Sequence, residues 1–199
     1  MRMIGITGGV GSGKSQVMCW LRENQPGEYL EADKIAHSLM ARGGACYEAV
    51  LKLFGEEILD EDGQLDRRKM GERVFREPKL REQLNAIVHP AVKEFVRKAA
   101  EEAVNRGEKF LFLEAALLIE EKYDEICDEL WYVYAEEKVR RERLRSSRRY
   151  SEQKMDEMMA SQLPEEEFRQ HCRFVLDNSG SFQETVQQLK QRMSLYGNV

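Results

Sequence analysis

A lysine and a serine near the start of the chain follow a run of glycines, in the order Gly8-Gly9-Val10-Gly11-Ser12-Gly13-Lys14-Ser15. The spacing fits the pattern G-x-x-x-x-G-K-[ST] at every fixed position. Glycines let successive backbone N–H groups turn inward toward phosphate oxygens. The lysine supplies a mobile cation for the outer phosphates, and the serine hydroxyl can ligate Mg²⁺. The sequence therefore predicts a loop that binds a nucleoside triphosphate.

Two carboxylates stand where predicted strands end. Glu114 follows the apolar run Phe110–Leu113 and occupies the place of an acid that holds the Mg²⁺ shell, although an ordinary strand-end carboxylate is the alternative. Asp33 follows the short run Tyr29-Leu30 and can accept a proton from an attacking hydroxyl or hold Mg²⁺ through water. It can equally be the N-cap of the helix predicted over residues 35–40, and its position alone does not decide between these roles.

Basic residues crowd into one stretch after the run Leu130–Tyr134; they are Lys138, Arg140, Arg141, Arg143, Arg145, Arg148 and Arg149. Three interpretations compete: a nucleic-acid patch, a solvated helix face, and a lid that carries arginines over the phosphates. The net charge of −5 disfavours the first. Most members of such a charge run only face solvent. We expect one or two of them to be lid arginines, because phosphoryl transfer depends on neutralising charge.

Strands and helices alternate along the chain, and this order positions these residues. Apolar runs predict strands at residues 2–7, 29–30, 110–113, 130–134 and 174–176. Helical periodicity is found at 16–21, 35–40, 46–54 and 182–193, and throughout 66–106, where His89-Pro90 is predicted to separate two helices. Strands that are apolar on every residue are typical of a parallel sheet covered on both faces. Ligands of such sheets bind at the carboxyl ends of the strands.

Composition narrows the class of protein. The chain has 199 residues, of which 42% are hydrophobic and 34% charged, as in a globular domain. No apolar stretch approaches the length of a membrane span, and the first strand leaves no room for a signal peptide, so we expect a cytoplasmic protein. The four cysteines are scattered and form no C-x-x-C pair, which favours reduced thiols.

An ordered series of motifs resembles the dephospho-coenzyme A kinase family from one end of the chain almost to the other. Besides the opening Ile4–Ser15, the matching segments are Glu31–Ala36 (D-A-D-x-I-A), Phe54–Leu59 with Asp62–Arg67 (F-G-x-x-I-L and D-G-x-L-x-R), Ile87–Val92 (I-x-H-P-x-V) and Asp177–Gly180 (D-N-x-G). The phosphate loop is common to many NTPases, whereas this series is far more specific.

The resemblance implies ATP-dependent phosphorylation of the ribose 3′-hydroxyl of dephospho-coenzyme A, with Mg²⁺. It implies a single P-loop domain over residues 1–199, an α/β/α fold of the adenylate-kinase type with a five-stranded parallel sheet, a helical substrate-binding insertion near 60–88 and a lid near 138–165. The expected partner is this small-molecule substrate, with no nucleic acid and no membrane. The sequence leaves a monomer and a weak homo-oligomer as alternatives.

The resemblance also assigns residues by position. Asp33 becomes the general base, and Arg140 and Arg148 become candidate catalytic lid arginines with Lys14. The ATP phosphates fall to Gly9, Gly11, Ser12, Gly13, Lys14, Ser15 and Gln16, with Asn178 in the loop expected near the adenine. The metal is assigned to Ser15 and Glu114, and the substrate side to Asp33, Arg67 and His89.

The chain departs from the family pattern at several positions. Glu31 stands where aspartate is usual, Gln16 where threonine is usual, and Glu114 begins E-A-A-L-L where the pattern is D-x-P-L-L. Met158 occupies the place of a lid arginine, which Arg148 or Arg149 can replace. Two alternatives follow: a kinase for another nucleoside or nucleotide, and an ATP-binding regulatory module that has lost catalysis. A nucleic-acid-dependent ATPase is a weaker one.

Overall fold

The computed structural model describes residues 1–197, which divide into two compact units. The sheet unit comprises residues 1–30 and the chain from 103 onward, and the helical unit comprises residues 31–102. Within the described residues, no helix is long and apolar enough to cross a membrane.

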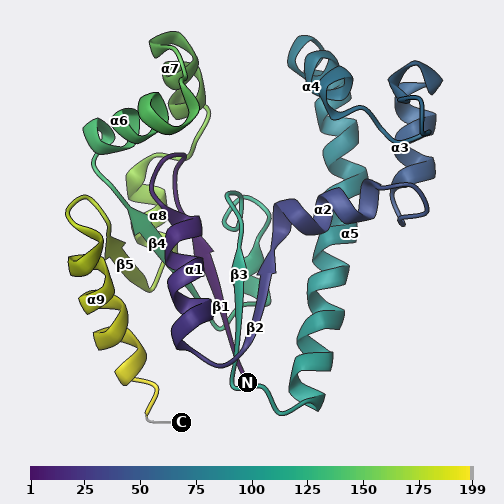
Figure 1. The fold of residues 1–199 in the computed structure, drawn as a ribbon. Helices are drawn as coiled ribbons and strands as arrows, with labels where there is room; N and C mark the ends of the chain where they lie inside the picture. The colour runs from purple at the N-terminus through teal and green to yellow at the C-terminus, as the bar shows by residue number, and fades with distance from the viewer. Residues whose placement is uncertain (198–199) are drawn as a thin grey trace. The chain divides into compact units, whose positions relative to one another are not determined.

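Five strands form the sheet: β1 (Arg2–Thr7), β2 (Glu28–Glu31), β3 (Phe110–Glu114), β4 (Glu129–Tyr134) and β5 (Phe174–Asp177). Their order across the sheet is β2-β3-β1-β4-β5, which places β1 in the centre (Figure 1). In the parallel ladders around β1, Ile6 pairs with Glu114 on one side and with Trp131 on the other. The predicted parallel α/β sheet of five strands is therefore confirmed.

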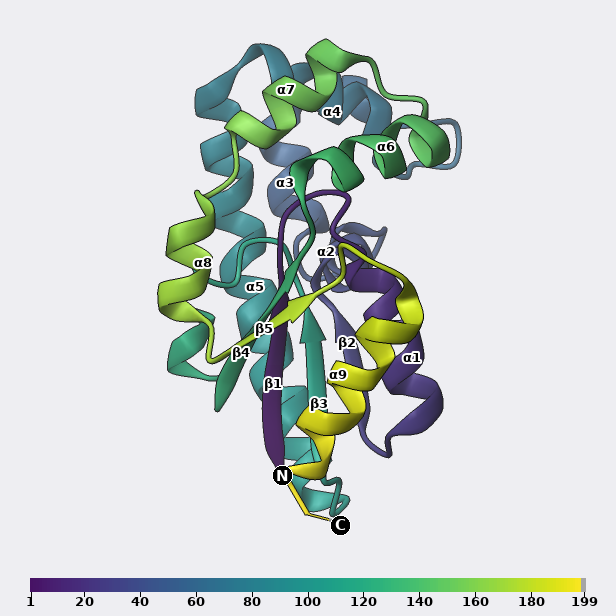
Figure 2. The same cartoon turned by 90° about the vertical axis from the view of Figure 1, so that its left-hand side faces the viewer.

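Helices cover both faces of the sheet. The helices of the sheet unit are α1 (Lys14–Asn24), α6 (Glu137–Arg148), α7 (Glu152–Ala160), α8 (Glu165–His171) and α9 (Phe182–Ser194), with a short 3-10 turn at Tyr123–Glu125. Figure 2 shows α1 and α9 on one side of the strands and α8 on the other. Figure 1 shows α6 and α7 beyond the carboxyl ends of β1 and β4, which is the end of the sheet that carries the phosphate loop.

The core lies between the sheet and the α1/α9 layer. Alternate residues of the strands face this layer, among them Ile4 and Ile6 of β1 and Trp131 of β4, all fully buried. Val17 and Leu21 of α1 meet them at helical spacing, also without exposed surface. Burial of each such side chain contributes about 1.5–3 kcal/mol, so this layer holds the start of α1 firmly against the centre of the sheet.

The helical unit contains α2 (Ala32–Met40), α3 (Tyr47–Phe54), a 3-10 turn at Glu56–Ile58, α4 (Arg67–Arg76) and most of α5 (Pro78–Asn105). Asp66 begins α4, because its carboxylate accepts hydrogen bonds from the backbone N–H groups of Arg68 and Lys69. Arg73 of α4 donates to the carbonyl of Phe54 at 2.6 Å and ties α4 to the end of α3.

Two local predictions in this unit were wrong. His89-Pro90 does not separate two helices, since α5 runs through Pro90 without a break. A proline inside a helix costs about 3 kcal/mol. Val88, Val92 and Val96 lie one turn apart and are at most 6% exposed, so burial of this continuous row offsets that cost. Asp33 is not the N-cap of α2, because Glu31 occupies that position and Asp33 lies in the first turn.

Candidate functional site

The glycine loop joins the carboxyl end of β1 to the first residue of α1. Gly11 has a φ of 78° and Gly13 a φ of 95°, in the left-handed region that side chains disfavour. Gly13 is the N-cap of α1, and its carbonyl accepts the backbone N–H groups of Gln16 at 3.0 Å and Val17 at 3.2 Å. The helix therefore begins directly at the loop and directs its free N–H groups and dipole toward the space beside it, as anion binding requires.

The side chain of Lys14 folds back onto the glycine loop. Its Nζ donates to the carbonyls of Gly8 at 2.6 Å and Gly9 at 3.2 Å. The ammonium group is thus held beside the loop on a flexible stem and can exchange carbonyl oxygens for phosphate oxygens. This arrangement agrees with the cation predicted at this position.

The sheet brings Ser15 and Glu114 together, although 99 residues separate them in the sequence. The Ser15 hydroxyl donates to Glu114 Oε1 at 3.3 Å. The register explains the meeting, because Glu114 ends β3 opposite Ile6, just before the loop begins. Two oxygen ligands suit Mg²⁺, which usually keeps water and substrate phosphates in its shell and takes only one or two protein ligands. Among the described residues there is no cluster of three or more acidic, histidine or cysteine ligands.

Arg140 of α6 contacts the glycine loop, and its role as a lid arginine stays a prediction. Its Nε donates to the carbonyl of Val10 at 2.8 Å, and its Nη2 donates to Gln162 Oε1 at 2.5 Å. A Cβ at Gly9 would come within 2.5 Å of Nη2, so a larger residue there would force the guanidinium to shift. Burial lowers the pKa of Arg140, yet a guanidinium stays protonated in proteins. A positive charge therefore lies against the loop in a partly dehydrated setting.

Arg143, one turn further along α6, is a loop contact that the sequence alone did not select. Its Nη1 donates to the carbonyl of Ser12 at 3.3 Å and its Nη2 to the carbonyl of Asn178 at 2.8 Å. The available signal was the i, i+3 spacing from Arg140, which puts both side chains on one face of a helix. The charge run contains several such pairs, and only the packing of α6 selects this one.

Other arginines of the run point elsewhere. Arg148 lies about two turns beyond Arg140, is exposed, and has its guanidinium 6.0 Å from the centre of the Tyr150 ring. Arg141 pairs with Glu137 at 2.7 Å and with Asp156 of α7 at 2.7 Å. The described contacts thus connect Arg140 and Arg143 to the loop, while the role assigned to Arg148 stays a prediction.

Asn178, expected near the adenine, uses both ends of its side-chain amide for hydrogen bonds within the protein. It is fully buried, and its Nδ2 donates to the carbonyl of Ser12 at 2.7 Å. Its Oδ1 accepts from Thr185 Oγ1 at 2.8 Å. The amide therefore supports the phosphate loop from within the fold. A direct contact between this side chain and a nucleotide stays a prediction.

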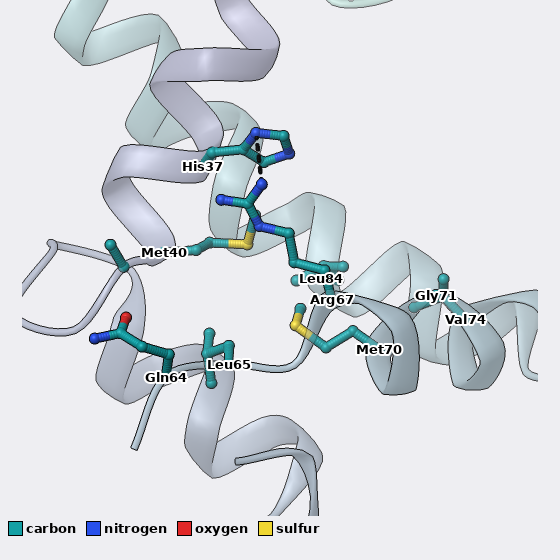
Figure 3. Close-up of a pocket in the computed structure, with 10 residues that line it drawn as sticks. His37, Met40, Gln64, Leu65, Arg67, Met70, Gly71, Val74 and Leu84 are labelled. Carbon is teal, nitrogen blue, oxygen red and sulfur yellow. Dashed lines mark hydrogen bonds between the residues drawn. The ribbon is translucent and has the colours of Figure 1, made fainter. Parts of the chain in front are cut away.

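The helical unit has a pocket of about 380 Å³ of its own (Figure 3). His37 and Arg67 point toward one another across it, with Arg67 Nη1 3.2 Å from His37 Nδ1. Because a guanidinium can only donate, His37 Nδ1 accepts and its other ring nitrogen carries the hydrogen. Met40, Leu65 and Met70 supply apolar lining. The pocket thus combines a cation, an imidazole and an apolar floor.

The remaining substrate-side predictions lie in this unit but outside the lining of that pocket. Asp33 is exposed on α2, one turn before His37, so both belong to the same helix face. His89 is half-buried on α5. Sequence analysis overlooked His37 and Met40. Their spacing from Asp33 along α2 was the signal that pointed to them.

A glycine loop between a central parallel strand and a helix, with a serine–glutamate pair and an arginine of α6 against the loop, defines a protein of the P-loop class. The model of the dephospho-CoA kinase family matches residues 2–184. The dephospho-CoA kinase of Aquifex aeolicus is 40% identical over 193 residues, which are 96% of this chain and 95% of that protein. The chain belongs to the dephospho-CoA kinase family.

Solved structures share this fold. The crystal structure of TT1252 from Thermus thermophilus is 31% identical, with a TM-score of 0.81 over 97% of this chain and 96% of that chain. Dephospho-CoA kinase from Campylobacter jejuni is 22% identical, with a TM-score of 0.71 over the full length of both chains, and supports the fold. The predicted family and fold class are both confirmed.

Proposed function

We propose that the protein transfers the γ-phosphoryl group of ATP to the ribose 3′-hydroxyl of dephospho-CoA, giving CoA and ADP. Membership of the family over nearly the whole chain is the observation that carries this proposal. The intact phosphate loop supports it, because Gly8, Gly13, Lys14 and Ser15 all stand at their required positions. Of the departures from the family pattern, the replacement of aspartate by Glu114 keeps the carboxylate beside Ser15.

On the donor side, the loop and α6 supply positive charge to the triphosphate. The N–H groups of residues 9–16 surround the phosphates, and Lys14 releases the carbonyls of Gly8 and Gly9 to follow the transferred group. Ser15 and Glu114 would hold Mg²⁺, which would neutralise the charge that develops during transfer. Arg140 adds a cation that is already partly dehydrated, which makes its interaction with phosphate stronger. The segment 138–165, with Arg148, acts as the lid.

On the acceptor side, Asp33 takes the proton as the hydroxyl oxygen attacks phosphorus, and the bond from phosphorus to the β–γ bridging oxygen breaks to release ADP. The helical segment near 60–88 binds the rest of the substrate. Arg67 belongs to the pocket in which it meets His37, and His89 lines the substrate side from α5. A guanidinium in that pocket suits a phosphorylated ligand, because arginine presents several donors in a fixed geometry.

The test measures ADP release with ATP and Mg²⁺, with and without dephospho-CoA, and identifies the product by mass. We expect acceptor-dependent release, and the Asp33→Asn variant should lose at least about 10²-fold in kcat while its ATP affinity stays unchanged. Asp124→Asn is the control, since Asp124 is an exposed aspartate in the turn Tyr123–Glu125, outside the segments assigned to ATP and substrate. Near-normal turnover by Asp33→Asn excludes this residue as the base. Release that responds only to another nucleoside or nucleotide changes the acceptor, and ATP binding without release contradicts the kinase assignment.

A further inference from the structure

A buried polar network lies behind the phosphate loop and is centred on one carbonyl. The Ser12 carbonyl accepts Asn178 Nδ2 at 2.7 Å and Arg143 Nη1 at 3.3 Å. Arg143 also donates to the Asn178 carbonyl at 2.8 Å, so the two donors are themselves connected. Ser12 is 1% exposed and Asn178 is fully buried. Two bonds from two distant segments thus converge on a single peptide of the loop, and a third joins the two donor residues to each other.

Thr185 of α9 sets the orientation of the Asn178 amide. It has no exposed surface, and its Oγ1 lies 2.8 Å from Asn178 Oδ1 and 3.3 Å from the carbonyl of Asp177. A hydroxyl carries one hydrogen, and both of these neighbours are acceptors. The shorter contact assigns the hydrogen to Asn178 Oδ1. With its oxygen held by Thr185, the amide must present its NH₂ to Ser12.

The planar Ser12–Gly13 peptide bond links the orientation of the Asn178 amide to the phosphate side of the loop. The carbonyl of Ser12 and the N–H of Gly13 belong to one trans peptide, so they point in opposite directions. Holding the carbonyl toward Asn178 and Arg143 therefore aims the Gly13 N–H away from them. Gly13 belongs to this peptide and Gly11 precedes Ser12; both have positive φ values, and glycine restricts the backbone least of all residues. The hydrogen bonds from Asn178 and Arg143 to the Ser12 carbonyl thus supply rigidity that the glycines lack.

We propose that Thr185, acting through Asn178 and together with Arg143, is a positioning residue that orients the Ser12–Gly13 peptide for the nucleotide phosphates. The proposal rests on the function proposed for the loop and names residues outside it that determine its affinity for ATP. Thr185 itself need not touch the nucleotide. Removing its hydroxyl leaves a buried amide oxygen without its donor and releases the amide to rotate, and the cost of such a loss is large enough to change affinity.

The test compares Thr185→Val, which keeps the shape and removes the hydroxyl, with Thr185→Ser, which restores the hydroxyl. ATP with Mg²⁺ is titrated by calorimetry into each full-length variant at 25 °C, and the melting temperature is measured in parallel. We expect Thr185→Val to bind ATP about tenfold more weakly. Thr185→Ser should bind within about twofold of the wild type, since it can donate the same bond. In turnover, Thr185→Val should raise KM for ATP and leave KM for the acceptor unchanged.

Unchanged ATP affinity in Thr185→Val, with only a lower melting temperature, overturns the proposal and leaves Thr185 a structural residue. Equal weakening in the Val and Ser variants overturns it as well. If Thr185→Val does not fold, Thr185→Ala replaces it under the same criteria. The titration contains no acceptor, so it measures the effect of Thr185 on ATP affinity even if the wild-type protein fails to phosphorylate dephospho-CoA. That failure would contradict the proposed function alone.

Discussion

Replacing Gly8 by alanine should damage the loop at a point where the surrounding backbone cannot yield. A Cβ on this residue collides with the backbone carbonyl of Val133, which belongs to the strand β4 beside β1. The φ of Gly8 is also 149°, where side chains are strained by about 1–3 kcal/mol. Since β4 is paired on both sides, it cannot retreat without losing ladder bonds. Strain and collision together should cost about 3–5 kcal/mol of unfolding free energy.

Gly107 is the matched control for this prediction. It lies in the same unit with a φ of 75°, and a Cβ there meets no atom within 4 Å. Gly107→Ala should therefore cost only the backbone strain, about 1–2 kcal/mol. Urea unfolding followed by tryptophan fluorescence reports this unit, because Trp20 and Trp131 are the two tryptophans of the chain.

ATP titration of the same two variants completes the test. Gly8→Ala should lose measurable ATP binding, whereas Gly107→Ala should bind as the wild type does, since Gly107 follows α5 and takes no part in the loop. Equal stability losses in the two variants, or normal ATP binding by Gly8→Ala, would refute the view that close approach of β4 dictates glycine at this position.

Two further predictions concern buried groups. Burial by itself raises the pKa of the Glu129 carboxyl, but hydrogen bonds from Tyr196 and Arg192 and the charge of Arg192 hold that pKa below its ordinary value of 4.5. The contribution of ionised Glu129 to the free energy of unfolding should therefore fade as the pH falls below about 4.5. Glu129→Gln should cost about 3–5 kcal/mol at pH 7 and flatten this acid dependence in urea unfolding. Burial raises the pKa of the Cys172 thiol to about 12, whereas Cys19 is exposed. Iodoacetamide at pH 8 should therefore label Cys19 before Cys172, as followed by mass spectrometry. Equal labelling of the two cysteines contradicts this prediction.

Much of the fold followed from local patterns that need no tertiary information. The apolar runs predicted the strands, and their order along the chain predicted a parallel sheet with its ligands at the carboxyl ends. The helix through Pro90 escaped this reasoning, because a proline breaks a helix locally and only the burial of Val88, Val92 and Val96 along one face shows what keeps it continuous. The helix predicted over residues 46–54 ends in the structure at Gly55, whose positive φ of 85° is a local property of glycine.

The sequence by itself determined the phosphate loop and the family, because spacing within eight residues and an ordered series of short motifs are properties of the chain alone. Tertiary structure decided which distant residues serve that loop. Glu114 meets Ser15 through the register of β3 with β1, and Arg140 and Arg143 are selected from seven cations by the packing of α6. These contacts join residues 99 to 131 positions apart, so they depend on how the layers pack, and no local pattern encodes that geometry.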